Sequence, residues 1–404
     1  MRFSVFIGNI LEHYDKALFG LLAPFIAPHF FAGDPVTSLI LTYAILPLGL
    51  LTRPLGSIFF GRLGDTRGRS YALFYSLLGT ACATFALGCI PSYQSIGILA
   101  PLLLAIIKMT QNFFAAAEEV GAGLYILEQT PKKNHCIASG WYNTSWIIGY
   151  LTASASITIV SAWTSVEHTW HLFFWAGSLT SIPAIILRFR HIDINTNNIV
   201  VKYKEIPRVV WQNRRSFMTI ILVAGMSYVT YDTVFVLMNG LIPLVTSIKK
   251  AEVMQANTLL LIGDMLLLPG FGYIAAKIGK ERLMKGAALV LALAICPLLQ
   301  LLEGSTFTTA LLIRTAIMAL GCAYAAPYQA WAIEQIAPEH RYMVLALGAA
   351  VSSQCIGAPV SALTLWLYQQ TGYLPVAGVY IALIAALSAY TMSRLHNSMI
   401  VTPA

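Results

Sequence analysis

Charged residues are scarce in this sequence, and their scarcity excludes a soluble globular protein. Only 10% of the 404 residues are Asp, Glu, Lys or Arg, whereas soluble proteins average about 25%. Hydrophobic residues make up 57% of the chain, and the mean hydropathy is +0.71. The net charge of +8 would suit nucleic acid, but the basic residues lie in short segments between apolar runs. Basic residues there orient a membrane protein, so we expect a lipid bilayer as partner and no nucleic acid.

Sequence motifs of enzymes are also missing. The chain has no Walker phosphate loop, no nucleophile elbow and no histidine-rich metal spacing, which predicts no enzyme, no metal and no cofactor. Its six cysteines are scattered through apolar runs, so we expect reduced packing residues. Residues 1–6 lead into an apolar stretch without a cleavage site, which predicts a retained first helix. Without an ATP site, the energy for any transport must come from an ion gradient or from the substrate gradient.

Long apolar runs are what the sequence has in abundance. Runs of about 20 residues recur along the whole length, and each is long enough to cross about 30 Å of hydrocarbon as a helix. We therefore predict an all-α membrane protein, with a six-helix bundle in residues 1–190, a polar cytoplasmic connector in 191–215, and a second six-helix bundle in 216–404. The twelve predicted helices span about 3–30, 36–60, 70–90, 95–127, 136–161, 168–188, 216–246, 253–277, 283–302, 306–335, 342–368 and 373–394.

The basic residues also indicate which side of the membrane each loop faces. With the N-terminus inside, nineteen Lys and Arg residues fall on the cytoplasmic side, and only Lys249 and Lys250 fall outside. This excess predicts that both termini are cytoplasmic. We expect a monomeric, multi-pass protein of a bacterial inner (plasma) membrane.

The two halves carry a decayed internal repeat. Residues around the loop after the second predicted helix recur after the eighth, and a glutamate at the end of the fourth recurs at the end of the tenth. The matching pairs are Gly61 with Gly272, Asp65 with Ala276, Gly68 with Gly279, Arg69 with Lys280, and Glu128 with Glu334. Duplicated halves of this kind place a substrate site near the bilayer midplane and rock around it.

The segment RPLGSIFFGRLGDTRGR, residues 53–69, alternates glycines and arginines around one acid. Glycines permit a tight turn and close helix approach, and an acid among arginines can join two helix ends. The pattern resembles the signature loop between the second and third helices of the major facilitator superfamily. That resemblance implies the superfamily's fold and a loop that latches the gate. The predicted gating residues are Arg53, Gly61, Asp65, Arg67, Gly68, Arg69 and Glu128.

Three segments narrow the resemblance to the metabolite:proton symporter branch, which includes proline/betaine, citrate, 2-oxoglutarate and shikimate transporters. They are GNILEHYDKALFG (8–20), RPLGSIFFGRLGD (53–65) and KMTQNFFAAAEEVGAGLYILEQTP (108–131). The chain departs from the branch pattern inside the expected pathway, so no single member's substrate is carried over. The departures are His13, Lys16, Lys108, Ala116, Ala117 and Glu119.

Ionisable side chains inside hydrocarbon are costly, so those within the apolar runs are candidates for function. The resemblance aligns Asp15 with the acid implicated in proton coupling and Glu118 with a pathway acid of the fourth helix. Glu119 is a second carboxylate beside it, and His13 could relay a proton. Each residue also has a structural reading: Asp15 as a partner of His13 or Lys108, Glu118 in a salt bridge, and His13 in packing. The predicted proton-coupling residues are Asp15, Glu118, Glu119 and His13.

A second group of residues is predicted to contact the substrate. Glu12 and Lys16 are four apart, so they pair within the helix unless Lys16 faces the substrate. Aromatic faces and carboxylates suit a cation, and basic side chains suit a carboxylate. Both signs together favour a small zwitterionic, amino-acid-like substrate or a carboxylate, although plain packing explains the tyrosines equally well. The predicted substrate-binding residues are Glu12, Lys16, Lys108, Tyr231, Asp232, Asp264, Arg314 and Tyr328.

These patterns favour uptake, by proton-coupled symport of a small polar metabolite through alternating access. Protons and a small molecule would be its partners. Helix 136–161 lacks the Gly-Pro pair typical of superfamily antiporters, so efflux of a drug or siderophore is the weaker alternative. A transport-inactive receptor or scaffold is the third reading, and the many ionisable residues within the apolar runs argue against it.

Overall fold

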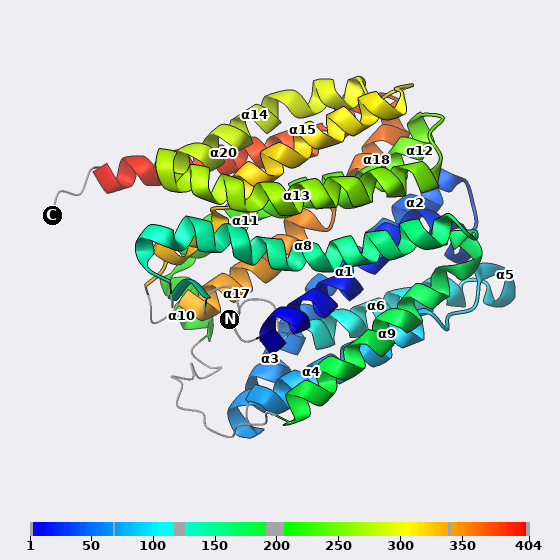
Figure 1. The fold of residues 1–404 in the computed structure, drawn as a ribbon, viewed down its shortest axis with the longest axis horizontal. Helices are drawn as coiled ribbons and strands as arrows, with labels where there is room; N and C mark the ends of the chain where they lie inside the picture. Colours follow the sequence, from blue (N-terminus) through cyan, green and yellow to red (C-terminus); the bar gives the residue numbers. More distant parts are fainter. Residues whose placement is uncertain are drawn as a thin grey trace. The chain divides into compact units, whose positions relative to one another are not determined.

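A computed structural model of the chain describes residues 3–67, 69–116, 126–128, 130–190, 206–337 and 341–400. Every regular element in this part of the chain is a helix (Figure 1). The chain divides into two compact units, the first with residues 1–122 and 148–214, the second with residues 123–147 and 215–404. The predicted division at residues 190 and 215 stays a prediction.

The first unit is a bundle of long helices whose cores pack face to face. Helix α4 runs along α9 and α6, α1 lies against α9 and α2, and α3 lies against α6 and α4 (Figure 1). Phe19 of α1 and Phe174 of α9 are fully buried. The elements are α1 (Phe3–Phe30), α2 (Pro35–Ala44), η1 (Leu46–Leu48), α3 (Gly49–Arg67), α4 (Arg69–Leu87), α5 (Tyr93–Ile96), α6 (Leu99–Ala115), the end of α8 (His135–Ser161), α9 (Val166–Arg190) and α10 (Ile206–Gln212).

The second unit is also a helical bundle, in which α14 packs against α15 and α20, and α13 packs against α15 (Figure 1). Trp331 and Tyr324 are its largest buried aromatic side chains. The elements are η2 (Lys132–Asn134), the start of α8, α11 (Arg214–Asp232), η4 (Thr233–Leu237), α12 (Met238–Val245), α13 (Lys250–Ile278), α14 (Lys280–Gln300), α15 (Phe307–Ala325), α16 (Tyr328–Ala332), η5 (Ile333–Gln335), α17 (Arg341–Ser352), η7 (Ser353–Gly357), α18 (Val360–Thr371), α19 (Leu374–Ala377) and α20 (Val379–Ile400).

Seven helical segments of the described chain are long and apolar enough to cross a membrane. They are Pro35–Phe60, Lys132–Ser161, Arg214–Val245, Lys250–Ile278, Lys280–Gln300, Phe307–Gln335 and Met343–Thr371. Shorter apolar helices cover Phe74–Leu87, Leu99–Ala115 and Val379–Arg394. Large leucines such as Leu293 and Leu266 are exposed on these helices, as a lipid-facing surface requires. The full count of twelve spans stays a prediction.

Local sequence explains where α2 begins. Gly33 adopts a φ of +136°, a conformation that glycine tolerates and other residues rarely adopt. Asp34 follows as the N-cap, and its Oδ2 accepts a hydrogen bond from the Thr37 backbone N–H at 2.9 Å. Pro35 then occupies the first helical position, where its missing N–H costs nothing. The predicted helix 36–60 is in fact three elements, because the short helix η1, with Pro47 near its start, separates α2 from α3.

Two of the long spans in the second unit contain a π-helical turn. The turn η4 lies between α11 and α12, and the turn η7 lies between α17 and α18. Such turns free backbone carbonyls, and side chains from other helices bind them here. Arg314 donates to the carbonyl of Val234 at 2.7 Å, and the Tyr380 hydroxyl donates to the carbonyl of Ile356 at 2.7 Å. Both interruptions fall within segments that the sequence predicts as continuous helices.

Candidate functional site

A buried polar network connects three helices of the first unit. Asp15 lies in the middle of α1 and is only 3% exposed. The Thr84 hydroxyl of α4 lies 3.4 Å from Asp15 Oδ2. On α6, Gln111 donates from Nε2 to Thr84 Oγ1 at 2.8 Å. Lys108, one turn earlier on α6, donates from Nζ to Gln111 Oε1 at 2.7 Å. A carboxyl group and an ammonium group are thus joined through two neutral side chains.

The neighbouring helices shape the space around this network. A Cβ added at Gly177 of α9 would collide with Asp15 Oδ1, so only glycine leaves room for the carboxyl group there. The Lys108 ammonium lies 4.8 Å from the centre of the Phe19 ring, in cation–π contact. Lys108 is itself 5% exposed, which removes most of its water. The network is therefore set in a largely dry interior.

The Thr84 hydroxyl gives the network two hydrogen-bonding arrangements. Its single proton can go to the backbone carbonyl of Thr80, 2.9 Å away, or to Asp15 Oδ2. Its oxygen accepts from Gln111 in either case. A change in the protonation of Asp15 can therefore reorganise the bonds that hold Gln111 and Lys108, because each member accepts from the next.

Three other predicted residues of the first unit, Arg53, His13 and Lys16, are described by their burial and position. Arg53 of α3 is buried, and its charge, like those of Asp15 and Lys16, acts on Lys108. His13 and Lys16 are half-buried on α1, one on either side of Asp15. The side chain of Glu12, together with Glu118 and Glu119, lies outside the described residues. The structure thus brings Asp15, Lys16, Lys108 and Arg53 into one electrostatic group.

A second buried polar cluster lies in the second unit. Asp264 of α13 is fully buried, and its Oδ1 accepts from the Tyr231 hydroxyl of α11 at 3.1 Å. The Cys322 thiol of α15 donates to the same oxygen. The Tyr231 ring lies 4.9 Å from the Trp146 ring of α8, in an edge-to-face arrangement. Two residues predicted to contact substrate, Tyr231 and Asp264, therefore contact each other.

Arg314 of α15 makes its hydrogen bonds with residues outside that cluster. Its guanidinium is 1% exposed and donates to neutral acceptors. These are the carbonyls of Val234 and Val253 and the side chains of Asn239 and Asn257. Arg314 thus joins α13 and α15 to the π-helical turn η4.

Two further predicted residues lie near the same turns. Asp232 ends α11 and is half-buried, and a Cβ at Gly357 of η7 would lie 3.5 Å from its Oδ2. Tyr328 is buried at the start of α16, with its ring 6.3 Å from that of Trp331. These contacts do not test whether either residue binds substrate, so that role stays a prediction.

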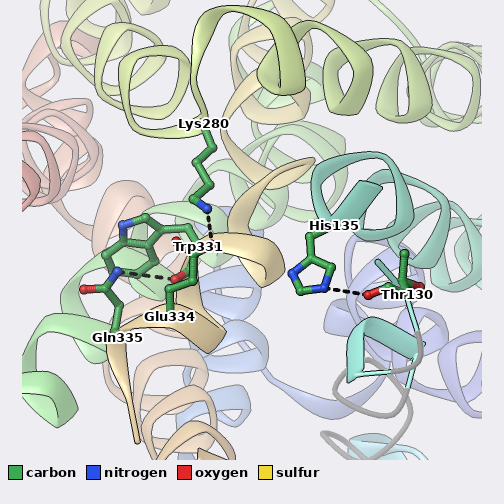
Figure 2. Close-up of polar contacts among 6 residues, drawn as sticks. All are labelled: Thr130, His135, Lys280, Trp331, Glu334 and Gln335. Atoms are coloured by element: carbon green, nitrogen blue, oxygen red, sulfur yellow. Dashed lines mark hydrogen bonds and ion pairs between the residues drawn. The ribbon is translucent and has the colours of Figure 1, made fainter. Parts of the chain in front are cut away.

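The repeated latch residues form ion pairs in the second unit. Lys280, the counterpart of Arg69, pairs with Glu334, the counterpart of Glu128 (Figure 2). Glu128 itself lies 3.9 Å from Arg341 Nη1. The glutamates are half exposed, so each pair contributes little stability, about 0–1 kcal/mol. The pairs therefore act mainly by fixing which helix ends meet.

The first copy of the latch is described only in part. Arg67 is exposed at the end of α3 and donates from Nη1 to the Tyr71 hydroxyl at 3.1 Å. Gly61 lies within α3. Gly68 and the side chains of Asp65 and Arg69 lie outside the described residues.

Several residues that complete these networks are absent from the predicted set. Thr84 and Gln111 join Asp15 to Lys108, and Cys322 completes the Asp264 cluster. Gln111 could have been found, because it lies one helical turn after Lys108 in an apolar helix. Thr84 and Cys322 give no such signal, since a single threonine or cysteine in an apolar helix is usually a packing residue.

The comparisons with known proteins agree with this architecture. Residues 5–245 match the family described as the Major Facilitator Superfamily. The chain is 26% identical over 410 residues to the proline/betaine transporter of Escherichia coli K12, covering 95% of this chain and 81% of the relative. It is 27% identical over 307 residues to the citrate-proton symporter of Salmonella typhi, covering 74% and 70%.

Solved structures support the fold. The partially occluded, inward-open xylose transporter XylE of E. coli superposes with a TM-score of 0.74 at 13% identity, covering 97% of this chain and 96% of that one. The human organic anion transporter MFSD10 gives a TM-score of 0.64 at 13% identity, covering 96% and 98%. At such identities the likeness shows the fold alone. The chain is therefore a multi-pass, all-α membrane protein, a transporter rather than an enzyme, and it belongs to the major facilitator superfamily.

Proposed function

We propose that this transporter is a proton-coupled symporter that takes up a small polar metabolite by alternating access. The network of Asp15, Thr84, Gln111 and Lys108 carries the proposal. A carboxyl group held in a dry interior, and joined through two neutral side chains to an ammonium group, changes the charge balance around that ammonium group when it takes up or releases a proton. The names of the two relatives, a proline/betaine transporter and a citrate-proton symporter, support the same reading.

Within this proposal Asp15 takes the proton, and its binding is transmitted to Lys108 through Thr84 and Gln111. Lys108 and Lys16 supply the positive charge that would attract a substrate carboxylate. Glu118 and Glu119 are further proton carriers, and His13 is a relay. The Asp232 carboxylate and the aromatic faces of the second unit would suit the cationic end of a zwitterion. A small amino-acid-like zwitterion or a carboxylate is therefore the proposed substrate.

The charge distribution and the ion pairs support a membrane location and an orientation for the protein. We place the transporter in a bacterial inner membrane with both termini in the cytoplasm, as the excess of basic residues in one set of loops requires. The pairs Lys280–Glu334 and Arg341–Glu128 then hold helix ends on the cytoplasmic side. Their release would accompany opening toward the cytoplasm.

Transport in proteoliposomes tests this proposal directly. Radiolabelled glycine betaine, proline and citrate are offered with an inwardly directed proton gradient, with and without a protonophore. We expect one of the three to accumulate, and the protonophore to abolish the accumulation. Accumulation that persists in the presence of the protonophore contradicts proton coupling. Export of the probe, measured in inverted vesicles, would favour efflux. Binding of a probe without any flux would favour the receptor alternative.

The role of Glu118 is tested by the variant Glu118→Gln. We expect this variant to lose the alkalinisation of the external medium that substrate addition produces. Uptake that stays coupled to pH in the variant would remove Glu118 from the proton pathway.

A further inference from the structure

Asp264 lies at the middle of the membrane-length helix α13 and is fully buried. Both of its hydrogen bonds, from the Tyr231 hydroxyl and the Cys322 thiol, go to Oδ1. Its other oxygen, Oδ2, is buried and has no hydrogen-bond partner among the described residues. The two carboxyl oxygens are therefore unequal, because one accepts two donors and the other accepts none.

The groups that face Asp264 do not include a cation that pairs with it. Tyr231 and Cys322 are the titratable groups that contact it from α11 and α15. Arg314, the buried cation of α15, directs its hydrogen bonds to amide side chains and backbone carbonyls. Helix α12 has no titratable residue, and α14 carries its charged residues within Lys280–Lys285. No ion pair to Asp264 occurs in the part of the chain that the structure describes.

A carboxylate without a cation or a full set of donors is costly to bury, whereas a neutral carboxylic acid costs much less. Both carboxyl oxygens of Asp264 are enclosed by protein, because Tyr231 and Cys322 bind Oδ1 and Oδ2 is buried. A proton neutralises such a carboxylate without needing any added space.

We infer that Asp264 is a proton-binding site of the second unit, separate from Asp15 in the first. The proton adds to Oδ2, where it displaces no existing bond. Hydronium plus carboxylate gives carboxylic acid plus water when the site is open to water, and the reverse step releases the proton. Tyr231 and Cys322 hold Oδ1 in both states. This inference rests on the proposed proton-coupled function and adds a second residue to it.

The structure also offers a route from this proton to a helix outside the cluster. The Tyr231 ring contacts Trp146 of α8. Trp146 donates to Asn143 Oδ1 at 3.3 Å, and Asn143 donates from Nδ2 to the Ala325 carbonyl of α15 at 2.7 Å. Ionisation of Asp264 would strengthen the bond from the Tyr231 hydroxyl, because charged acceptors bind donors more tightly. Tyr231 would then transmit the protonation state to α8.

Infrared spectroscopy of the full chain in lipid tests the inference without any substrate. A protonated carboxylic acid has a carbonyl stretching band that shifts in D₂O, and we expect this band in the wild-type protein at pH 7. Asp264→Asn should remove the band, or its largest component. Glu252→Gln, which changes an exposed carboxylate on the same helix, should leave the band in place. A band of equal size in Asp264→Asn overturns the inference.

A second pair of variants keeps the test decisive if Asp264→Asn does not fold. Tyr231→Phe and Cys322→Ala each remove one donor from Oδ1, so each should shift the frequency of the same band. An unshifted band in both variants overturns the inference. Because no transport is measured, a failure of this test differs from a failure of symport: wild-type protein that moves protons with substrate, yet shows no Asp264 band, loses only the present inference.

Discussion

Thr84 is the residue on which the first buried network depends, because it contacts both Asp15 and Gln111. Its hydroxyl accepts from Gln111 at 2.8 Å and lies 3.4 Å from the Asp15 carboxyl group. The sequence allowed both ends of the network, Asp15 and Lys108, to be predicted from the cost of charge in hydrocarbon. The two neutral residues between them could not be predicted, since their role depends on which helices pack together.

The variant Thr84→Val tests that central position. Valine keeps the shape of threonine but removes the hydroxyl, so Gln111 loses an acceptor and Asp15 loses a neighbour. The cost of such an unmade buried bond is about 1–3 kcal/mol. We expect proton-driven accumulation in proteoliposomes to fall by about tenfold or more, in line with that cost. The matched control is Thr80→Val on the same helix, whose hydroxyl bonds to the carbonyl of Ser76. Equal transport by the two variants would contradict the role of Thr84.

Asp34, which lies outside the membrane-spanning segments, makes a pH-dependent contribution to the stability of the folded protein. Hydrogen bonds from the Thr37 side chain and backbone N–H lower the pKa of the Asp34 carboxyl group below its usual value. A lowered pKa in the folded state means that the ionised group stabilises the protein above the unfolded-state pKa. That contribution is lost as the pH falls through the folded-state pKa.

Thermal unfolding of Asp34→Ala and Asp34→Asn measures this effect. At pH 7 we expect the alanine variant to unfold at a lower temperature than the wild type, because α2 loses its N-cap. The difference should shrink in acid, where the wild-type carboxyl group is protonated. An asparagine side chain caps a helix without a charge, so Asp34→Asn should unfold with less dependence on pH than the wild type. A wild-type advantage over alanine that persists unchanged in acid would contradict this explanation.

At the scale of helices, α8 and α13 approach each other closely through glycine. A Cβ at Gly140 would lie 2.7 Å from the Leu268 carbonyl oxygen, and one at Gly272 would lie 2.7 Å from that of Cys136. Small residues allow such backbone contacts between helices in membranes. Gly272 was predicted as the repeat counterpart of Gly61, but its partner helix was not, because a sequence repeat does not show which surface a glycine faces.

The variant Gly272→Ala should therefore disrupt this contact. The added methyl group would push α8 away from α13, and we expect a lower thermal unfolding midpoint and slower uptake. The control is Gly270→Ala, two residues away on the same helix, where a Cβ would meet nothing within 4 Å. Alanine is the better helix former, so this control should keep or slightly raise the midpoint. If both variants behave alike, the close contact has no role.

The π-helical turns that interrupt the long helices could not be predicted from the hydrophobic pattern of the sequence. Hydrophobic runs predicted the segments that contain α11, α12, α17 and α18, but they did not predict the π-helical turns within them. A π-turn changes the backbone hydrogen bonding without changing the apolar character of the residues. What marks the turn in η4 is Arg314, a residue far along the chain that binds the freed carbonyl of Val234.

For the whole molecule, low charge and membrane-length apolar runs predicted an all-α membrane protein, and the family comparison confirms that fold. The motif between Arg53 and Arg69 predicted the major facilitator superfamily, which the match over residues 5–245 also confirms. The count of twelve helices, the orientation of the termini and the site residues stay predictions. The predicted orientation rests on the placement of charged residues alone. The roles of the site residues depend on contacts among helices, which the sequence does not show.

The most direct test of the account compares wild-type protein with Asp15→Asn in the same proteoliposomes, using the probe that accumulates. Asparagine mimics the protonated carboxyl group and cannot release a proton. We expect the variant to exchange labelled for unlabelled probe across the membrane, because alternating access remains, but to lose accumulation driven by a proton gradient. Accumulation at the wild-type level in Asp15→Asn would contradict the claim that this buried carboxyl group couples protons to transport.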